Sequence, residues 1–102
     1  SQTEAIVGEE AVETLDKYNF TKGFWGTNGI SVTKGFSTPE VKEAMVKKHS
    51  MENCKKCYIL ADSSKFDRMS SVKFADFDQA TVLTTGLLKP ALKKYKNIVE
   101  VK

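Results

Sequence analysis

A short apolar run that turns abruptly polar constrains the fold of this chain more than any other feature. Residues 58–61 (Tyr-Ile-Leu-Ala) have the composition of a buried strand, and residues 62–65 (Asp-Ser-Ser-Lys) follow at once. In open α/β sheets, ligands bind just beyond the carboxyl ends of strands. The stretch therefore predicts a strand that delivers polar groups to a binding site. A capped turn, with Asp62 or Ser63 as the cap and Lys65 in solvent, explains the same residues, and both interpretations stay open.

Strands and helices are expected to alternate along the rest of the chain. Short apolar runs predict strands at 20–25, 81–85 and 98–101, and a strand-like piece at 71–77. Apolar residues at helical spacing predict helices at 8–18, 39–51 and 88–95. Residues 30–36 are expected to form a loop or a weak strand. Because this alternation favours parallel pairing with crossover connections, we expect an α/β fold with a mostly parallel sheet flanked by helices.

The clearest helix start lies at residues 38–40. Thr38 is expected to be the N-cap, Pro39 the first helical residue and Glu40 part of the first turn. The apolar stripe of this helix consists of Val41, Ala44, Met45 and Met51.

Composition and charge limit the functions open to the chain. Its 102 residues are enough for one domain with a modest core. Lysine and arginine number 16 against 13 acidic residues, and the resulting charge of +3 does not by itself argue for nucleic acid. No apolar stretch is long enough to span a membrane, and no secretory signal opens the chain. The lysines expected on a solvated helix face are Lys89, Lys93, Lys94 and Lys96.

Cys54 and Cys57 form a CxxC motif with three competing explanations. A zinc site needs two more ligands, and His49 is the only histidine. A thioredoxin-like redox site needs its first cysteine at a helix N-terminus, whereas this motif is expected to end a helix and enter a strand. A structural role, with Cys57 as a small core residue, is therefore favoured. The two cysteines are expected to be reduced and metal-free in the cytosol.

A glycine-containing turn follows the predicted strand at 20–25 directly. Residues 26–29 (Gly-Thr-Asn-Gly) place two glycines around Asn28, which allows positive φ and leaves backbone N–H groups open. Most such turns are plain connectors. After a strand of an α/β sheet, the same turn is a suitable wall for an anionic ligand.

Four motifs occur in order along the chain: residues 23–30 (Gly-Phe-Trp-Gly-Thr-Asn-Gly-Ile), 34–39 (Lys-Gly-Phe-Ser-Thr-Pro), 43–47 (Glu-Ala-Met-Val-Lys) and 60–66 (Leu-Ala-Asp-Ser-Ser-Lys-Phe). In combination they resemble the effector-binding domain of DeoR-type transcriptional regulators, over a match from about Thr3 to Val101. The implied fold is shared with ribose-5-phosphate isomerase, glucosamine-6-phosphate deaminase and CoA transferases. Two positions depart from the family pattern: Asn28 stands where many relatives carry aspartate, and Thr85 where an acid is usual.

The resemblance implies a bacterial repressor or activator of sugar metabolism. Its effector would be a phosphorylated sugar, often a product of a sugar phosphotransferase system. In that family a winged helix-turn-helix precedes the sensor domain. Residues 1–102 are therefore expected to be the C-terminal portion of the effector-binding domain, excised from a longer protein, as a start without Met also indicates. The full-length protein is expected to be a cytoplasmic homo-oligomer that binds DNA only through the missing part and needs no cofactor.

A sugar phosphate requires a cation, N–H donors and polar groups for its hydroxyls. Lys65 is expected to supply the cation, the glycine-containing turn the N–H donors, and Asp62 or Asn28 the groups that bind hydroxyls. A helix carrying Glu43 and Lys47 could close the site, although an i,i+4 surface ion pair explains these two residues better. The candidate effector-binding residues are Gly26, Thr27, Asn28, Gly29, Glu43, Lys47, Asp62, Ser63 and Lys65.

Three functions compete on this fold. The leading hypothesis is a regulatory sensor in which ligand binding shifts the equilibrium between DNA-competent and DNA-incompetent arrangements of the full protein. The second is a sugar-phosphate isomerase or deaminase, which needs a carboxylate base at the reacting carbon. Asn28 cannot serve as that base, and Glu43 is the only nearby candidate. The third is a dimerisation scaffold without a ligand. This chain alone is not expected to bind DNA specifically.

Overall fold

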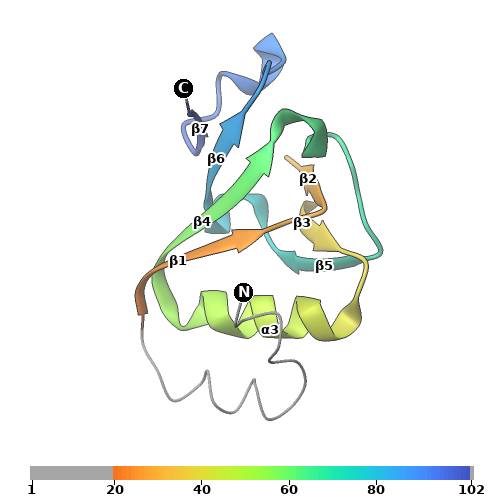
Figure 1. Cartoon of the computed structure of the whole chain (residues 1–102), viewed down its shortest axis with the longest axis vertical. Coiled ribbons are helices and arrows are strands. Elements are labelled where there is room, and N and C mark those ends of the chain that lie inside the picture. The colour runs from red at the N-terminus through yellow and green to blue at the C-terminus, as the bar shows by residue number, and fades with distance from the viewer. Residues whose placement is uncertain (1–19, 102) are drawn as a thin grey trace.

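The computed structural model describes residues 20–101. A parallel sheet runs through the molecule (Figure 1). Its strands, in spatial order, are β1 (Phe20–Gly26), β4 (Cys54–Asp62), β6 (Thr81–Thr85) and β7 (Ile98–Glu100). Every neighbouring pair is parallel. The predicted α/β fold and the strands predicted near 20–25, 81–85 and 98–101 are confirmed, whereas the helix predicted at 8–18 lies outside the described residues.

The second sheet, which is antiparallel, is not predicted by the sequence. It consists of β2 (Gly29–Ser31), β3 (Gly35–Thr38) and β5 (Val72–Ala75), in that order. The segment expected to be a loop or weak strand thus contains two paired strands. Gly35, at the start of β3, adopts a φ of 95°, which favours glycine. A Cβ there would also lie 2.1 Å from the Ala75 carbonyl oxygen, so the pairing of β3 with β5 requires a glycine.

The helix α3 (Val41–Glu52) begins two residues later than expected, with Glu40 as its N-cap. Its first hydrogen bond runs from the Ala44 N–H to the Glu40 carbonyl at 3.0 Å. Thr38 is instead the fully buried last residue of β3, so its prediction as the N-cap is wrong. The Thr38 hydroxyl bonds to other side chains and is not available to the helix. Of the predicted apolar stripe, the buried residues are Ala44 and Met51, and the exposed residues are Val41 and Met45.

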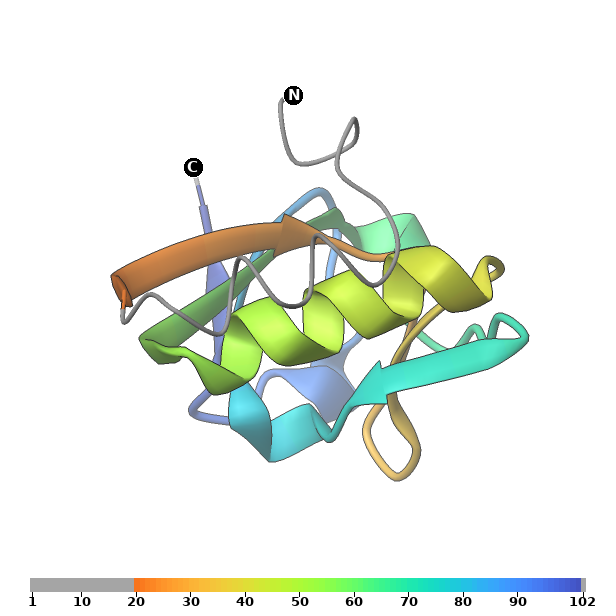
Figure 2. The same cartoon turned by 90° about the horizontal axis from the view of Figure 1, so that it is seen from below.

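The hydrophobic core lies between the parallel sheet and a layer made of α3 and the antiparallel sheet (Figure 2). Ile59 on β4 and Val82 on β6 are completely buried there. Trp25 on β1 packs against the same core, and its indole N–H donates to the Ser50 hydroxyl of α3 at 2.8 Å. The aromatic residues that fill the core from the second layer are Phe36, Phe74 and Phe77.

The predicted helix through residues 88–95 is wrong. The segment forms one 3₁₀ turn, η3 (Pro90–Leu92), before the chain enters β7. A proline disfavours helical conformation in the residue before it, and Lys89 is extended, with φ −62° and ψ 140°. Lys89 forms an ion pair with Asp67 at 2.9 Å instead of lying on a helix face. The residues of this segment that reach the core are Leu88, Leu92 and Tyr95, as their spacing indicates.

The CxxC motif lies between α3 and the middle of β4, as predicted, but both of its cysteines already belong to β4, which begins at Cys54. Both cysteines are free, and Cys57 packs half-buried against the core. Its thiol donates toward the carbonyl oxygens of Met51 at 3.5 Å and Cys54 at 3.9 Å. Burial, and then the neighbouring Cys54, raise the pKa of Cys57 to about 11. This environment agrees with the structural interpretation of the motif.

Candidate functional site

The polar segments that follow β1 and β4 meet at the carboxyl edge of the parallel sheet. Gly26, the last residue of β1, is in register with Leu60, close to the end of β4. Beyond the strand ends, an isolated parallel bridge joins Ile30 to Phe66. The Asp67 N–H also donates to the Ile30 carbonyl at 2.9 Å. These contacts hold the two segments side by side, although they are far apart in the sequence.

Hydrogen bonds and a close backbone contact shape the turn after β1. The hydroxyl of the buried Thr27 lies 2.9 Å from the Gly29 carbonyl oxygen and 3.0 Å from that of Ser37. The Asn28 N–H donates to the Ser37 carbonyl at 3.0 Å. This N–H group is therefore not available to a ligand, contrary to the expectation from the sequence. Gly29 packs against the Arg68 carbonyl oxygen, which a Cβ would approach to 2.5 Å. Neither glycine of the turn adopts the expected positive φ.

Asn28 and Glu43, which come from the turn and from α3, meet at Thr38. The Thr38 hydroxyl oxygen lies 3.2 Å from Asn28 Oδ1 and 3.3 Å from Glu43 Oε2. A hydroxyl carries one hydrogen, so it donates to one of these acceptors at a time. Thr38 is buried beneath the two exposed side chains. The contacts of Thr38 with Asn28 and Glu43 are not predicted from the sequence, because Thr-Pro-Glu is also a typical helix start.

Lys47 lies one turn after Glu43 on α3 and reaches the end of β1. Its Nζ donates to the Gly26 carbonyl at 2.8 Å and lies 5.2 Å from the centroid of the Phe74 ring. Within the described part of the chain, Glu43 and Lys47 form no ion pair with each other, so the surface pair favoured by their spacing is not formed. The helix instead places both side chains beside the turn after β1. The contact between the Lys47 ammonium and the Phe74 ring cannot be predicted from the sequence, because the two residues come from different elements.

The segment after β4 is a capped 3₁₀ turn, η1 (Ser63–Lys65). The Asp62 carboxylate is its N-cap, and its Oδ1 accepts hydrogen bonds from the Ser64 N–H, at 2.8 Å, and from the Ser64 hydroxyl. These bonds lower the pKa of Asp62 below its ordinary value. The capping expected of Asp62 is therefore confirmed. Within the described part of the chain, Asp62 Oδ2 forms no hydrogen bond and can accept one from a ligand.

Ser63 and Lys65 occupy the two ends of this turn. Ser63 lies against Gly86, where a Cβ would come within 2.6 Å of the Ser63 hydroxyl oxygen. This contact brings the segment after β6 to the same edge of the sheet. The Lys65 side chain is half-buried, and it forms no hydrogen bond or ion pair with any described residue. Its ammonium group is therefore available to an anion.

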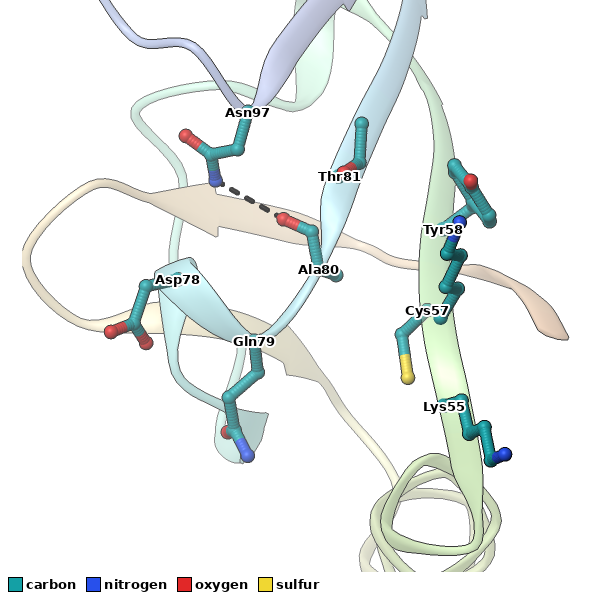
Figure 3. A pocket seen from close by; sticks show the side chains of 9 residues that line it. Lys55, Cys57, Tyr58, Asp78, Gln79, Ala80, Thr81 and Asn97 are labelled. Atoms are coloured by element: carbon teal, nitrogen blue, oxygen red, sulfur yellow. Dashed lines mark hydrogen bonds between the residues drawn. The ribbon is translucent and has the colours of Figure 1, made fainter. Parts of the chain in front are cut away.

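A hollow of about 370 Å³ lies at the opposite, amino edge of the parallel sheet (Figure 3). Asn97 lines it, and its amide donates to the carbonyl oxygens of Phe77 at 3.0 Å and Ala80 at 3.1 Å. The Asn97 amide thus fixes the chain ahead of β7. None of the nine candidate residues lines this hollow. Figure 3 also shows Cys57 and Tyr58 extending from opposite sides of β4.

A parallel sheet that presents a lysine, an amide and carboxylates at its carboxyl edge has the arrangement of an α/β ligand-binding domain. The chain belongs to the family described as the DeoR C terminal sensor domain, whose model matches residues 1–86. This finding confirms the family indicated by the sequence motifs. Among the residues that the structure describes, no helix has the length and apolar character needed to cross a membrane.

Curated relatives agree with this family. The chain is 38% identical over 101 residues to the HTH-type transcriptional regulator FruR of Bacillus subtilis (strain 168), and the match covers 99% of this chain and 40% of that protein. It is 36% identical over 84 residues to the HTH-type transcriptional regulator GlpR of Haloferax volcanii, and this match covers 82% of this chain and 33% of that protein. It is 31% identical over 103 residues to the lactose phosphotransferase system repressor of Streptococcus mutans serotype c, and this match covers 97% of this chain and 41% of that protein. The chain therefore spans 33–41% of the length of these relatives.

Proposed function

We propose that the chain is the C-terminal portion of the effector-binding domain of a sugar-responsive transcriptional regulator, and that its carboxyl edge binds a phosphorylated sugar. A winged helix-turn-helix and the first part of the sensor domain belong, in this proposal, to the rest of the polypeptide. DNA is bound only there. The proposal is supported by relatives that are named as a lactose phosphotransferase system repressor and as a glycerol-3-phosphate regulon repressor.

The observation that carries the proposal is that Lys65, which pairs with no described residue, lies on a segment held beside the turn after β1. A half-buried lysine pairs strongly with a phosphate because water screens the pair less there. Asp62 Oδ2 accepts a hydrogen bond from a sugar hydroxyl, and Asn28 and Glu43 offer further polar groups on the neighbouring segments. Lys47 and Ser63 border the same edge. The residues that hold the turn in shape are Gly26, Thr27 and Gly29.

In this proposal the domain regulates and does not catalyse. The three relatives compared above are named as regulators of transcription. Asn28 occupies the turn where an isomerase would need a base, and an amide cannot abstract a proton. The effector shifts the balance between two arrangements of a cytoplasmic homo-oligomer, because it binds one arrangement more tightly than the other.

A thermal-shift screen tests the proposal. The full-length regulator is heated with each of a panel of phosphosugars and, in parallel, with the matching unphosphorylated sugars. A ligand that binds only the folded state at about 100 times its Kd stabilises that state by about 2.7 kcal/mol. We expect at least one phosphosugar to raise the Tm by several degrees in a concentration-dependent way, while its unphosphorylated partner does not. No response to any phosphosugar, or chemical turnover of one, would contradict the proposal.

A further inference from the structure

The buried hydroxyl of Thr38 connects two exposed side chains of the candidate site. Thr38 is the last residue of β3, is completely buried, and is in register with Val72 of β5. Among the described residues, its hydroxyl bonds only to Asn28, from the turn after β1, and to Glu43, from α3. Burying a hydroxyl costs free energy unless it is hydrogen-bonded. The Thr38 hydroxyl therefore depends on these two side chains, and they on it.

The amide, the hydroxyl and the carboxylate satisfy one another in one arrangement. The hydroxyl has a single hydrogen, yet Asn28 Oδ1 lies 3.2 Å and Glu43 Oε2 lies 3.3 Å from its oxygen. With two oxygens facing the hydroxyl, one of these contacts brings lone pairs together. Half a turn of the Asn28 amide exchanges Oδ1 and Nδ2 at nearly the same positions. The amide then donates to the Thr38 hydroxyl, which donates to the Glu43 carboxylate, so both contacts become hydrogen bonds.

No other contact of Asn28 within residues 20–101 opposes this half turn. Its side chain forms no further hydrogen bond there. Its backbone is held separately, because the Asn28 N–H donates to the Ser37 carbonyl at 3.0 Å. The hydroxyl of Thr27 is bound to backbone carbonyl oxygens and does not reach the amide. The Thr38 hydroxyl is thus the group that decides which atom of the Asn28 amide is turned outward.

We propose that Thr38 is a positioning residue that turns the oxygen of the Asn28 amide outward. This oxygen and the free oxygen of the Glu43 carboxylate accept hydrogen bonds from two hydroxyls on neighbouring carbons of the effector. The two acceptors are neighbours because they share one hydroxyl as a partner. The effector is then a phosphosugar with a free vicinal diol, and its phosphate is bound at Lys65. This inference rests on the proposed function and names the class of sugar that it recognises.

Calorimetric titration of the full-length regulator tests the recognition of the diol. The ligands are the phosphosugar that stabilises the protein in the thermal-shift screen and its mono-deoxy analogues, which keep the phosphate. We expect two analogues that lack neighbouring hydroxyls to bind the wild type more weakly than the others do. The Kd should rise by about threefold without the hydroxyl that donates to the amide, and by about tenfold or more without the one that donates to the carboxylate.

Variants of Thr38 connect this recognition to the buried hydroxyl. Thr38→Val should raise the Kd of the intact phosphosugar by about tenfold, and the loss of the hydroxyl that donates to the amide should then have little further effect. Thr38→Ser keeps the hydroxyl and should bind within about twofold of the wild type, even where the missing methyl group lowers the Tm. The matched control is Thr84→Val, because Thr84 is equally buried but donates to the Thr85 carbonyl at 3.4 Å. This control should leave the Kd unchanged.

Neutron diffraction from crystals of the deuterated regulator without effector shows the orientation of the amide directly. We expect deuterium on the Asn28 atom that faces Thr38, and the deuterium of the Thr38 hydroxyl directed at Glu43. An oxygen of Asn28 facing the hydroxyl would overturn the inference, whichever effector the protein binds.

The titrations can overturn the inference as well. Equal effects of each missing hydroxyl in the wild type and in Thr38→Val would mean that the Thr38 hydroxyl does not position the site. Weak binding by Thr38→Ser and Thr38→Val alike, in step with their Tm, would mean that it only holds the fold. A screen without any phosphosugar response contradicts the proposed function and the diol together, whereas a response without these differences overturns only the role of Thr38.

Discussion

At the scale of single residues, the candidate site separates into side chains that face solvent and residues that hold the backbone. Asn28, Glu43 and Asp62 are exposed; Asp62 accepts a hydrogen bond from the Ser64 hydroxyl, and Asn28 and Glu43 share the single hydrogen of the Thr38 hydroxyl. Thr27 and Gly29 are buried and shape the turn. The sequence identifies the residue types correctly as polar groups at strand ends. It cannot show which of them are already committed to the fold, because those partners come from distant segments.

Cys57 gives a prediction at the same scale. Its pKa is raised from the ordinary 9.0 to about 11, chiefly by burial, so the folded state favours the protonated thiol. Its contribution to stability is therefore complete below pH 9 and is lost as the pH rises from 9 toward 11. Urea unfolding across this range should show a steeper fall in the free energy of unfolding for the wild type than for Cys57→Ala, which has no thiol to titrate. Parallel curves for the two proteins would contradict this assignment.

At the scale of elements, Gly35 decides whether the antiparallel sheet can form. An alanine there must adopt a positive φ, which costs about 1–2 kcal/mol, and its Cβ must also displace the Ala75 backbone. We expect Gly35→Ala to lower the free energy of unfolding by about 2–4 kcal/mol and the Tm by about 10 °C or more. Lys34→Ala, which changes an exposed side chain in the same hairpin, is the control and should have little effect. Equal stability of Gly35→Ala and the wild type would refute the role given to this glycine.

The elements also show what sequence patterns can and cannot predict. Strands of the parallel sheet are buried on at least one face and read as apolar runs, so β1, β6 and β7 were placed nearly to the residue. The spacing of Leu88, Leu92 and Tyr95 identified core residues correctly but suggested a helix that Pro90 and the nearby start of β7 do not allow. Of the antiparallel sheet, the sequence predicts only β5, within the strand-like piece at 71–77. The pairing of its strands is not predicted, because they are short and pair through contacts such as Gly35 with Ala75.

At the scale of the whole molecule, the topology brings the candidate site residues together. Parallel order puts the ends of β1, β4 and β6 at one edge, and the bridge between Ile30 and Phe66 brings the two polar segments together. The family match explains why the motifs occur in this order. The sequence of residues 62–65 is compatible both with a ligand-binding segment and with a capped turn. Asp62 caps the turn and Lys65 pairs with no described residue, so the capped turn is confirmed, while ligand binding by the same segment stays a prediction.

The measurement that tests the central claim most directly is calorimetric titration of the full-length regulator with its stabilising phosphosugar, in the wild type, in Lys65→Met and in the control Lys55→Met. Lys55 is an exposed lysine at the amino end of β4, away from the proposed site. A charge-assisted hydrogen bond contributes about 1.5–3 kcal/mol, so Lys65→Met should raise the Kd by about ten- to a hundredfold. Lys55→Met should not change the Kd. In Lys65→Met, the affinity for the unphosphorylated sugar, if that sugar binds, should fall much less than the affinity for the phosphosugar. Equal losses for both sugars, or no loss for either, would contradict a phosphate contact at Lys65.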